Sequence, residues 1–481
     1  MFKNDNILVL ENVNLVDMKR NELLKNMSLI VREGIITEIG KYGDLTTPKE
    51  AKVLILTGKT VIPGLIDAHA HLLQSGVDDY LKPYAESVFK KLKRNSLLTL
   101  NSGVTTVRNM PGGKGYTVLK FRDKINANKL KGPRIVTSGP ALSPPYGYFS
   151  TKMFFPFNAV LRFLFKKLFL VTSLSIDVDS KEKAKKAVKE LDRRGVDFIK
   201  TVTTGKFIPF IENDESLKHE LLKRGLKEKI IEASMKTEVL STIINEAHNR
   251  GLKVAAHNVC YPKDFKIATE FGVDSIEHTP FGIIDDETFD IMKNKGTYWV
   301  PTGFCSYNYI NLLKNSNEYK TVMKNVPEPF YTLGEKTLGK IRDGIKKDDK
   351  FYSIMCKEIE KLNNEYFPKN FKNALTKGIK IVAAVDAGVS GSCYVPHGQL
   401  YKELELFVRN GMSEFNAIKT ATLTPAELLG LENKIGSIEI GKYGDIVVLD
   451  GNPLDDILNV KEVRYVIKEG IIVYSKESNN E

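Results

Sequence analysis

Residues 61–72 read V-I-P-G-L-I-D-A-H-A-H-L, and this stretch decides the fold. An apolar run rich in β-branched residues ends in Asp67, and His69 and His71 follow two positions apart. Because alternate side chains of an extended strand point to the same side, both histidines are expected to project together from a strand end. Neutral imidazole is a good ligand for zinc and related metal ions. The pair therefore predicts a transition-metal site, although two ordinary strand-end histidines would give the same pattern.

The composition is that of a globular chain large enough for two or three domains, or for one large barrel with an attachment. Its 481 residues are 42% hydrophobic and 27% charged. The net charge is +12, but the lysines are spread over most helical segments and mixed with glutamate. No nucleic-acid-binding module is recognisable. We therefore interpret the charge as a solvated basic surface and expect no nucleic-acid partner.

Four cysteines, Cys260, Cys305, Cys356 and Cys393, are widely spaced and form no C-x-x-C pair. This spacing favours a reducing compartment without a disulfide framework. The first ten residues lack the apolar run and the small-residue cleavage site of a signal peptide. A cytoplasmic location is therefore expected.

Both ends of the chain are rich in short apolar runs that are separated by glycines. Near the N-terminus these runs cover residues 7–10, 27–31 and 35–39, and near the C-terminus they cover 446–449, 463–467 and 471–474. Such runs between turn residues predict strands. We expect residues 1–60 and 431–481 to form one small β-sandwich domain around a different middle region, residues 61–430.

The middle region alternates short apolar runs with helical stretches, two of which cover residues 181–194 and 238–249 and end near Gly195 and Gly251. We count eight apolar runs as strands: 60–67, 104–108, 134–138, 197–202, 253–257, 274–277, 298–301 and 380–386. Strands alternating with helices predict a parallel sheet, and eight such units predict an α/β fold of the (β/α)8 TIM-barrel type. A doubly wound sheet is the alternative, but polar residues at so many strand ends favour the barrel.

Barrel enzymes carry their chemistry at the carboxyl ends of the strands. Five of these ends carry side chains that suit a metal site, namely His69, His71, Lys200, His257, His278 and Asp386. His219 and His248 lie in helical stretches and are interpreted as surface or packing residues, whereas His397 is left undecided. An ammonium group has no lone pair for a metal, so Lys200 is either a lysine paired with an acid or a lysine carbamate formed with CO2.

Several motifs together resemble the amidohydrolase superfamily over nearly the whole chain. They are P-G-L-I-D-A-H-A-H (63–71), G-V-T-T-V-R (103–108), G-P-R-I-V-T-S-G (132–139), S-I-E-H (275–278), D-A-G (386–388), H-G (397–398), T-P-A-E-L-L-G (424–430) and G-S-I-E-I-G-K-Y-G-D-I-V-V-L-D (436–450). The nearest branch is prolidase-like and imidazolonepropionase-related. Within it, Lys200 in G-V-D-F-I-K resembles the carboxylated lysine of binuclear dipeptidases. Mononuclear imidazolonepropionases lack that lysine, so Lys200 argues against their activity.

The resemblance implies a centre of two divalent ions, with zinc as the expected metal. His69, His71 and Asp386 would hold one ion, His257 and His278 would hold the other, and the carbamate of Lys200 would bridge both. Asp386 would also be the catalytic residue, taking a proton from the attacking water and passing it to the leaving amine.

The chain departs from the family pattern in the substrate region. Ala384 and Val385 stand where Gly-Thr is common, Tyr148 stands where histidine is usual, and Asn109 stands where aspartate is common. The predicted substrate contacts are Arg108, Tyr146, Tyr148 and His397. Arg108 would pair with a carboxylate or serve as a structural strand-end arginine, and Tyr148 would donate a hydrogen bond or anchor its loop.

These observations predict a metal-dependent hydrolase of an amide bond in a small molecule, either a dipeptide or an N-acyl amino acid. A cyclic amide, a lactone or a phosphotriester is the alternative substrate class, and a catalytically silent barrel that binds a ligand is the alternative outside enzymes. We also expect a homo-oligomer.

Three insertions exceed what a plain barrel needs: residues 151–172, 206–236 and 303–372. Within the first, residues 154–171 carry Asn158, Arg162 and Lys166 at four-residue spacing, and the remaining positions are mostly Phe, Leu and Val. The three positive charges of this run, Arg162, Lys166 and Lys167, argue against a transmembrane span. A lid or dimer contact is one interpretation, and a peripheral helix on a lipid surface is the other.

Overall fold

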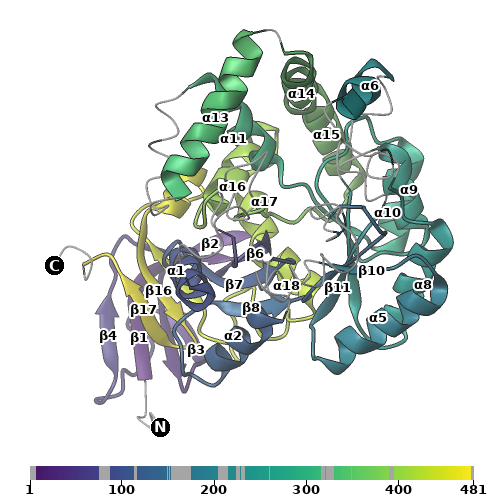
Figure 1. Ribbon diagram of the computed structural model, residues 1–481. Coiled ribbons are helices and arrows are strands. Elements are labelled where there is room, and N and C mark those ends of the chain that lie inside the picture. The colour runs from purple at the N-terminus through teal and green to yellow at the C-terminus, as the bar shows by residue number, and fades with distance from the viewer. Residues whose placement is uncertain are drawn as a thin grey trace.

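The computed structural model describes residues 7–74, 87–112, 116–148, 150, 152, 175–203, 215–223, 228, 233–258, 261–315, 320, 330–347, 349–388 and 395–477. Figure 1 shows strands from both chain ends on one side of a larger α/β region. The apolar insertion at residues 154–171 lies outside the described residues, so its packing and membrane interpretations both stay predictions.

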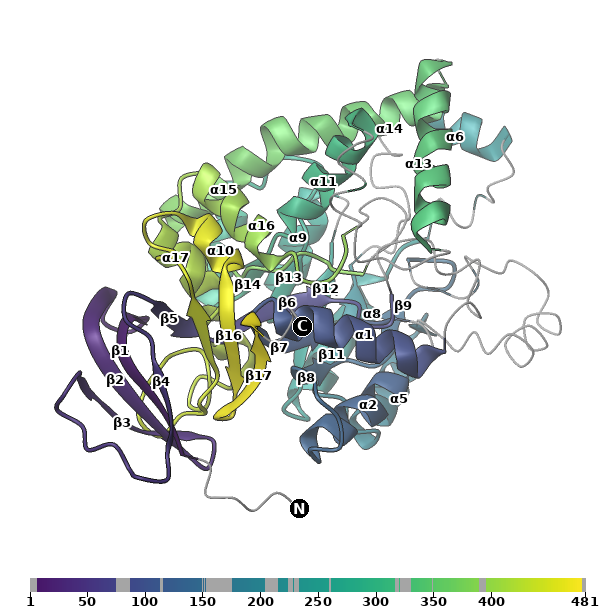
Figure 2. The ribbon, with the colours of Figure 1, turned by 90° about the vertical axis from the view of Figure 1, so that its left-hand side faces the viewer.

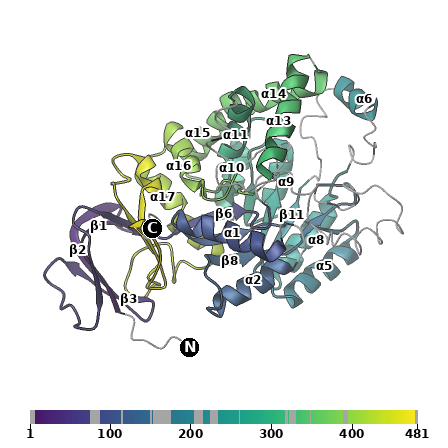
Figure 3. The same ribbon diagram turned by 60° about the vertical axis from the view of Figure 1, so that its left-hand side comes forward.

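Strands from the two chain ends, which were expected in one small β-sandwich domain, share one eight-stranded sheet. Its order is β17-β16-β15-β5-β1-β2-β3, and β4 pairs with β1. The strands are β1 (Ile7–Asp17), β2 (Glu22–Arg32), β3 (Ile35–Lys41), β4 (Lys52–Ile55), β5 (Thr60–Pro63), β15 (Ile446–Leu449), β16 (Val463–Lys468) and β17 (Ile471–Ser475). Figure 3 shows this sheet on the side of the molecule away from helices α13 (Phe330–Lys346) and α14 (Lys350–Lys361).

The strands that were expected to form a β-sandwich hydrogen-bond as one sheet that curls around a shared core. The backbone of Ile36 in β3 donates to the carbonyl of Lys442 at 2.9 Å, just before β15. Leu10, Leu29 and Val448 come from three different strands and are all fully buried in the same cluster. Alternation of inward apolar and outward polar residues lets a sheet bury one face in this way.

Nine further strands belong to the middle region, and every pairing among them is parallel. One sheet has the order β6-β7-β8 and the other has the order β10-β9-β11-β12-β13-β14. Their bounds are β6 (Leu65–Ala70), β7 (Val104–Asn109), β8 (Arg134–Thr137), β9 (Ala141–Ser143), β10 (Ser175–Asp177), β11 (Phe198–Val202), β12 (Lys253–His257), β13 (Ser275–Glu277) and β14 (Tyr298–Val300).

Backbone contacts connect the two parallel sheets on both sides. Asp197, just before β11, donates to the carbonyl of Thr137 in β8 at 2.9 Å. On the other side, Trp299 in β14 forms a parallel bridge with Ile381, and Ala387 forms one with Ala70 in β6. Residues 381–387 thus lie between β14 and β6, which is the eighth position of the predicted barrel. They contribute isolated bridges and no regular strand, so the expected strand over 380–386 is wrong in that detail.

The first predicted strand, residues 60–67, is divided into β5 and β6 at Gly64. β5 pairs with β1 and β15 of the composite sheet, whereas β6 begins the parallel sheet. A Cβ on Gly64 would lie 2.1 Å from Oγ1 of Thr105, so only glycine allows this close approach to the chain of β7. The apolar run is continuous through this position, which is why the sequence pattern did not show the break.

The third predicted strand, residues 134–138, is confirmed as β8, and the sequence did not predict the short strand β9 that follows it. Leu142 in β9 pairs with Thr201 in β11, and β10 adds a parallel partner to β9 that the sequence did not predict.

Helices cover the outside of the parallel strands (Figure 1). The predicted helices at 181–194 and 238–249 are confirmed as α5 (Lys181–Arg193) and α8 (Thr237–His248). Ser180 caps α5 by accepting a hydrogen bond from the backbone of Lys183. The other helices that follow or flank the strands are α1 (Val88–Asn101), α2 (Thr117–Asn126), α9 (Pro262–Glu270), α10 (Asp286–Lys295), α15 (Phe367–Lys377), α16 (Leu400–Arg409), α17 (Glu414–Thr420), α18 (Leu423–Leu429) and the 3₁₀ helix Ile457–Lys461.

A second group of helices stands over one end of the parallel strands (Figure 2). It contains α6 (Glu215–Lys223), α11 (Gly303–Lys314), α13 and α14, with a π-helical turn, Leu362–Tyr366, joining α14 to α15. Tyr309, Leu312 and Leu338 form a separate apolar cluster between α11, α13 and α14. Among the described residues, no helix combines the length and the apolar character needed to cross a membrane.

Cys305 in α11 is disulfide-bonded, whereas Cys356 in α14 is a free thiol. The bonded Cys305 departs from the expectation of a reducing compartment without a disulfide framework.

Candidate metal centre

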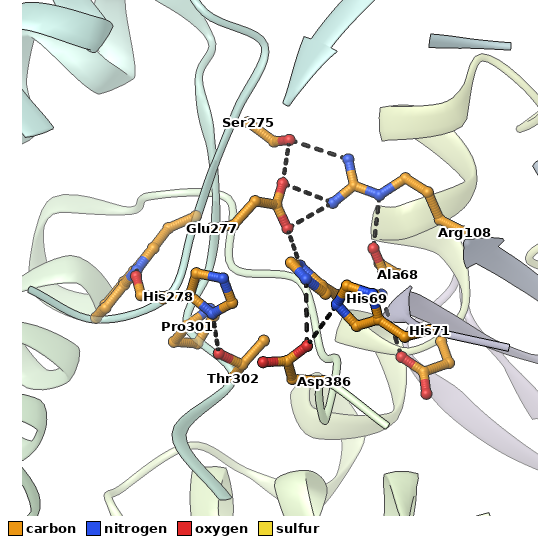
Figure 4. Close-up of polar contacts among 12 residues, drawn as sticks. Ala68, His69, His71, Arg108, Ser275, Glu277, His278, Pro301, Thr302 and Asp386 are labelled. Atoms are coloured by element: carbon orange, nitrogen blue, oxygen red, sulfur yellow. Dashed lines mark hydrogen bonds and ion pairs between the residues drawn. The ribbon is translucent and has the colours of Figure 1, made fainter. Parts of the chain in front are cut away.

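His69, His71 and Asp386 meet at the end of β6 (Figure 4). Each offers a ligand atom, and these atoms lie within 4.8 Å of one another. Nε2 of His71 is 3.1 Å from Oδ1 of Asp386, and Nε2 of His69 is 3.4 Å from the same oxygen. All three side chains are buried. Two imidazole nitrogens and a carboxylate oxygen are donors that zinc accepts, so this cluster fits a divalent metal ion.

A tight turn delivers Asp386 to this cluster and explains the D-A-G motif. Asp386 has a φ of 57°, and Gly388 has a φ of +90°. A Cβ on Gly388 would lie 2.4 Å from the carbonyl oxygen of His71, so glycine is required there. The backbone of His71 also donates to the carbonyl of Ala387 at 2.7 Å. These contacts join the turn directly to the strand that carries both histidines.

The outward nitrogens of the two histidines are held by other groups. Nδ1 of His69 lies 2.7 Å from Oε2 of Glu277, and Nδ1 of His71 lies 2.6 Å from the carbonyl oxygen of Pro111. A carboxylate or carbonyl partner keeps the hydrogen on Nδ1 and leaves Nε2 free to bind a metal. In both residues Nε2 is the atom that faces Asp386.

Glu277 is the centre of a buried polar network that the sequence interpretation missed (Figure 4). Arg108 donates to both of its carboxylate oxygens, at 2.7 and 2.9 Å, and Ser275 donates to one of them at 2.6 Å. Glu277 is 0% exposed and Arg108 is 2% exposed. This fully paired carboxylate fixes the ring of His69. The motif S-I-E-H contained the signal, but only its histidine was interpreted.

Arg108 was predicted to contact the substrate or to be a structural residue. Its Nε donates to the carbonyl of Ala68 at 2.6 Å, and its other nitrogens donate to Ser275 and Glu277. These contacts support the structural interpretation, because the guanidinium group is already engaged inside the fold.

His257 and His278 lie next to the three-residue cluster. The ring centroids of His69 and His278 are 4.7 Å apart, and those of His257 and His278 are 4.5 Å apart. The ring of Tyr148 stacks on that of His257, with centroids 4.4 Å apart and planes inclined by 15°. The structure thus places all four predicted histidines in one buried group.

Lys200 in β11 is 1% exposed, and among the described residues its Nζ has no hydrogen-bond partner. Burial lowers its pKa to about 8, and its charge in turn lowers the pKa values of His69 and His257. An isolated ammonium in such a place is unfavourable. Uncharged Lys200 or its carbamate is compatible with these surroundings.

Burial also decides the charge of the other groups. It lowers the pKa of His69, His257 and His278 well below the usual value, so these rings are neutral, which is the form that binds metals. Burial alone would raise the pKa of Asp386, but the neighbouring His71, His278 and Lys200 outweigh burial in the metal-free site and lower it. Asp386 is therefore ionised.

The other predicted substrate contacts have intramolecular partners. His397 is buried, and its Nε2 donates to the carbonyl of Gln74 at 2.9 Å, which supports a role in bracing the turn after β6. The backbone of Tyr146 donates to Ser150, and the carbonyl of Tyr148 accepts from Ser143. The ring of Tyr148 touches a predicted metal ligand, since it stacks on the ring of His257.

The two helical histidines are at the surface, as predicted. His219 is exposed in α6, and His248 in α8 lies 2.8 Å from Asp274.

Comparisons with known proteins agree with this geometry. The model of the amidohydrolase family matches residues 60–473, so the chain belongs to this family. A protein named imidazolonepropionase from Clostridium tetani is 22% identical over 488 residues, which cover 96% of this chain and 93% of that protein.

Two solved structures are similar over nearly the whole chain. A Xaa-Pro dipeptidase, crystallised with methionine in its active site, superposes with a TM-score of 0.71 and 26% identity, covering 98% of this chain and all of that one. An ochratoxinase from A. niger gives a TM-score of 0.69 at 22% identity, covering 98% of this chain and 96% of that one, and this likeness concerns the fold. The chain is therefore a hydrolase that acts on carbon–nitrogen bonds.

Proposed function

We propose that this protein is a binuclear metal-dependent amidohydrolase that cleaves an amide bond in a dipeptide or an N-acyl amino acid. The observation that carries the proposal is buried Lys200, whose Nζ has no hydrogen-bond partner among the described residues. Four histidines and Asp386 surround the same strand ends. The likeness to a Xaa-Pro dipeptidase, at 26% identity over 98% of the chain, supports the dipeptide class. In this proposal the parallel strands form a closed (β/α)8 barrel over residues 61–430.

Lys200 is suited to become a carbamate. Only the neutral amine has the lone pair that attacks the carbon of CO2, and burial lowers the pKa of Lys200 to about 8. The new N–C bond forms as the nitrogen loses one proton to solvent, and the product carries one negative charge on two oxygens. The carbamate would place a negative charge among the neutral imidazoles, where the ammonium would place a positive one. Its two oxygens would hold both metal ions.

In the proposed centre, His69, His71 and Asp386 would hold one ion, and His257 and His278 would hold the other. Bound divalent ions would lower the pKa of water and polarise the carbonyl of the scissile bond. Asp386, which is ionised and buried, would accept the proton that the attacking water loses and deliver it to the departing amine nitrogen. Glu277 and Pro111 would keep Nε2 of His69 and His71 directed at the centre.

Hydrolysis of a ring amide is the second candidate. The observation that favours it is the full-length relative named imidazolonepropionase. Lys200 favours the dipeptide or N-acyl class, because the binuclear dipeptidases that this chain resembles carry a carboxylated lysine at the matching strand end. Zinc as the metal, a homo-oligomer as the assembly and the cytoplasm as the location stay predictions.

Metal analysis of purified protein tests the centre directly. We expect about two divalent ions per chain in the native protein. Lys200→Ala should lose metal and activity, and added short carboxylic acids should restore part of both by replacing the missing carboxylate. Lys253→Ala, in the neighbouring strand β12, is the control and should keep its metal. Protein that binds no divalent ion even when the metal is supplied would contradict the proposal. Metal-loaded protein in which Lys200 is unmodified would contradict it too.

A hydrolysis screen across dipeptides, N-acyl amino acids, cyclic amides and lactones separates the substrate classes. The first two classes should give the highest kcat/KM. If the protein binds two metal ions but prefers cyclic amides, the proposed metal centre stands and the proposed substrate class is wrong.

A further inference from the structure

Two residues that follow the paired strands β13 and β14 have an unusual backbone conformation. His278 has a φ of 75°, and Thr302 has a φ of 46°. Left-handed backbone is uncommon for any residue except glycine, and for a β-branched residue such as Thr302 it is an outlier that surrounding contacts must stabilise. This strained backbone, next to a predicted metal ligand, must be held by contacts with other residues.

His278 is fixed on three sides. Its backbone donates to the carbonyl of Val300 at 2.7 Å, and its own carbonyl accepts from Nε1 of Trp299 at 2.8 Å. The third contact is to the ring, where Nδ1 lies 2.8 Å from Oγ1 of Thr302 (Figure 4). A hydrogen on Nδ1 that points to Thr302 leaves Nε2 as the free nitrogen.

Thr302 precedes α11 and occupies its N-cap position, but its hydroxyl does not cap the helix. A threonine at this position normally accepts a hydrogen bond from the helix backbone. Here the hydroxyl faces His278 instead, so the first amides of α11 need another acceptor.

Glu403 is that acceptor. It lies in α16, far away in the sequence, and is 0% exposed. Its Oε1 accepts from the backbone of Gly303 at 2.8 Å, and its Oε2 accepts from Phe304 at 2.7 Å. A Cβ on Gly303 would lie 2.8 Å from the side chain of Leu406, so the start of α11 fits closely against α16. Glu403 therefore takes over the capping role that Thr302 has given up.

We propose that Glu403 is a positioning residue for His278: by capping α11 from α16 it frees the hydroxyl of Thr302 to hold the ring of His278 with Nε2 directed at the metal centre. This inference rests on the proposed function, in which His278 is a metal ligand. The resemblance to the family assigned no role to Glu403 or Thr302. The chain of contacts runs from Glu403 to Gly303 and Phe304, then to Thr302, and then to His278.

The test uses metal-free protein with ¹⁵N-labelled histidine side chains, where the nitrogen signals report which ring nitrogen carries hydrogen. The signals of His278 are assigned by their disappearance in His278→Gln. We expect a single Nδ1–H tautomer in the unmodified protein. Glu403→Gln should give mixed tautomers of His278, because an amide offers one acceptor for two backbone donors. Thr302→Val, which keeps the shape and leaves the cap intact, should give the same mixture, whereas Thr302→Ser should retain the single tautomer.

Glu405→Gln, in the same helix but partly exposed and paired with Lys402, is the matched control. It should leave the tautomer unchanged. Zinc titration should show Glu403→Gln binding about 10-fold to 100-fold more weakly, the range found when an outer partner of a ligating histidine is removed. If Glu403→Gln fails to fold, Glu403→Asp replaces it, and its zinc affinity should lie between that of the unmodified protein and that expected for Glu403→Gln.

Hydrogen exchange in the unmodified protein gives a readout that needs no variant. The amides of Gly303 and Phe304 should be strongly protected, and rapid exchange there would overturn the cap. An unchanged His278 tautomer in Glu403→Gln would overturn the positioning role. Neither readout needs hydrolysis, so a protein that binds zinc but cleaves no tested amide would refute the proposed function and leave this inference standing.

Discussion

Glu277 and Arg108 form a buried ion pair that holds a predicted ligand rather than the substrate. Removing one member of such a pair is much more destabilising than its net contribution suggests, because the other charge stays buried without a partner. Glu277 also has no spare oxygen, since Arg108, Ser275 and His69 all lie within hydrogen-bond distance of it. The network is therefore a stability element and a positioning element at once.

Glu277→Gln should destabilise the metal-free protein by about 3–5 kcal/mol, since Arg108 would lose its counter-charge. Unfolding in denaturant, followed by circular dichroism, measures this change. Glu287→Gln is the control, because that glutamate is exposed and pairs only with Lys266 among the described contacts. It should change stability by less than about 1 kcal/mol. A Glu277→Gln variant as stable as this control would contradict the account of the network.

The residues of the site differ in how far the sequence predicts them. His69 and His71 are legible because two-residue spacing on one strand fixes their common direction. Thr302 and Glu403 were not predicted, since nothing in their local sequence shows which helix their side chains meet. The structural role of Arg108 was stated as an alternative, but choosing it required the contacts of its side chain with Ser275 and Glu277. Contacts between distant elements are what a single sequence leaves open.

At the scale of elements, the alternation of apolar runs and helical stretches predicted seven of the nine strands described in the parallel region and missed β9 and β10. The failures have physical causes. β5 and β6 read as one run because both are fully buried, so no polar residue marks the break at Gly64. The eighth strand is reduced to bridges because the chain turns sharply at Asp386 and Gly388. β4 was not among the expected strands, although Val53, Leu54 and Ile55 form a short apolar run, and three of its four residues are exposed.

The last strands belong to the core of the whole protein. Val463 and Val466 in β16, together with Val460, lie in the same apolar cluster as residues of β6 and β7. Each fully buried aliphatic side chain contributes about 1.5–3 kcal/mol, so losing several of them is comparable with the total stability of a typical domain, about 5–15 kcal/mol.

A chain that ends at Asp450, and so lacks β16 and β17, should fail to fold cooperatively. The expected signs are the loss of near-ultraviolet circular dichroism and of a sharp thermal transition. A chain that ends at Glu477 keeps every strand and is the control. Cooperative unfolding of the shorter chain would show that the C-terminal strands are an independent attachment.

For the whole molecule, buried titratable groups act on stability in opposite directions as pH changes. Burial holds the pKa of His69, His257 and His278 below the usual value, so these groups destabilise the folded state as pH falls and the unfolded chain takes up protons. Burial raises the pKa of Asp67 to about 7 and that of Glu403 to about 8, so these carboxyls act in the other direction. The histidines oppose folding below about pH 6.5, and the carboxyls oppose it increasingly from about pH 4 to about pH 8, so metal-free protein should be most stable within this overlap, where the two slopes cancel.

The contribution of Glu403 can be isolated. Its pKa is raised from 4.5 to about 8, first by burial and further by the charge of Asp67, although the two backbone donors lower it. The folded state therefore keeps a proton that the unfolded chain loses above pH 4.5. The stability from this group is complete below about pH 4.5 and is lost progressively as pH rises to about 8, a change on the order of 5 kcal/mol.

Glu403→Gln cannot ionise, so its stability should not show this loss. Relative to the unmodified protein, the variant should be less stable near pH 5, because one amide of α11 lacks an acceptor, and should gain on it steadily up to about pH 8. Denaturant unfolding of the metal-free proteins at pH 5, 7 and 9 measures the difference, with Glu405→Gln as the control that should follow the unmodified protein throughout. A difference between Glu403→Gln and the unmodified protein that stays constant across this range would mean that Glu403 ionises at the same pH in both states, which burial at 0% exposure makes unfavourable.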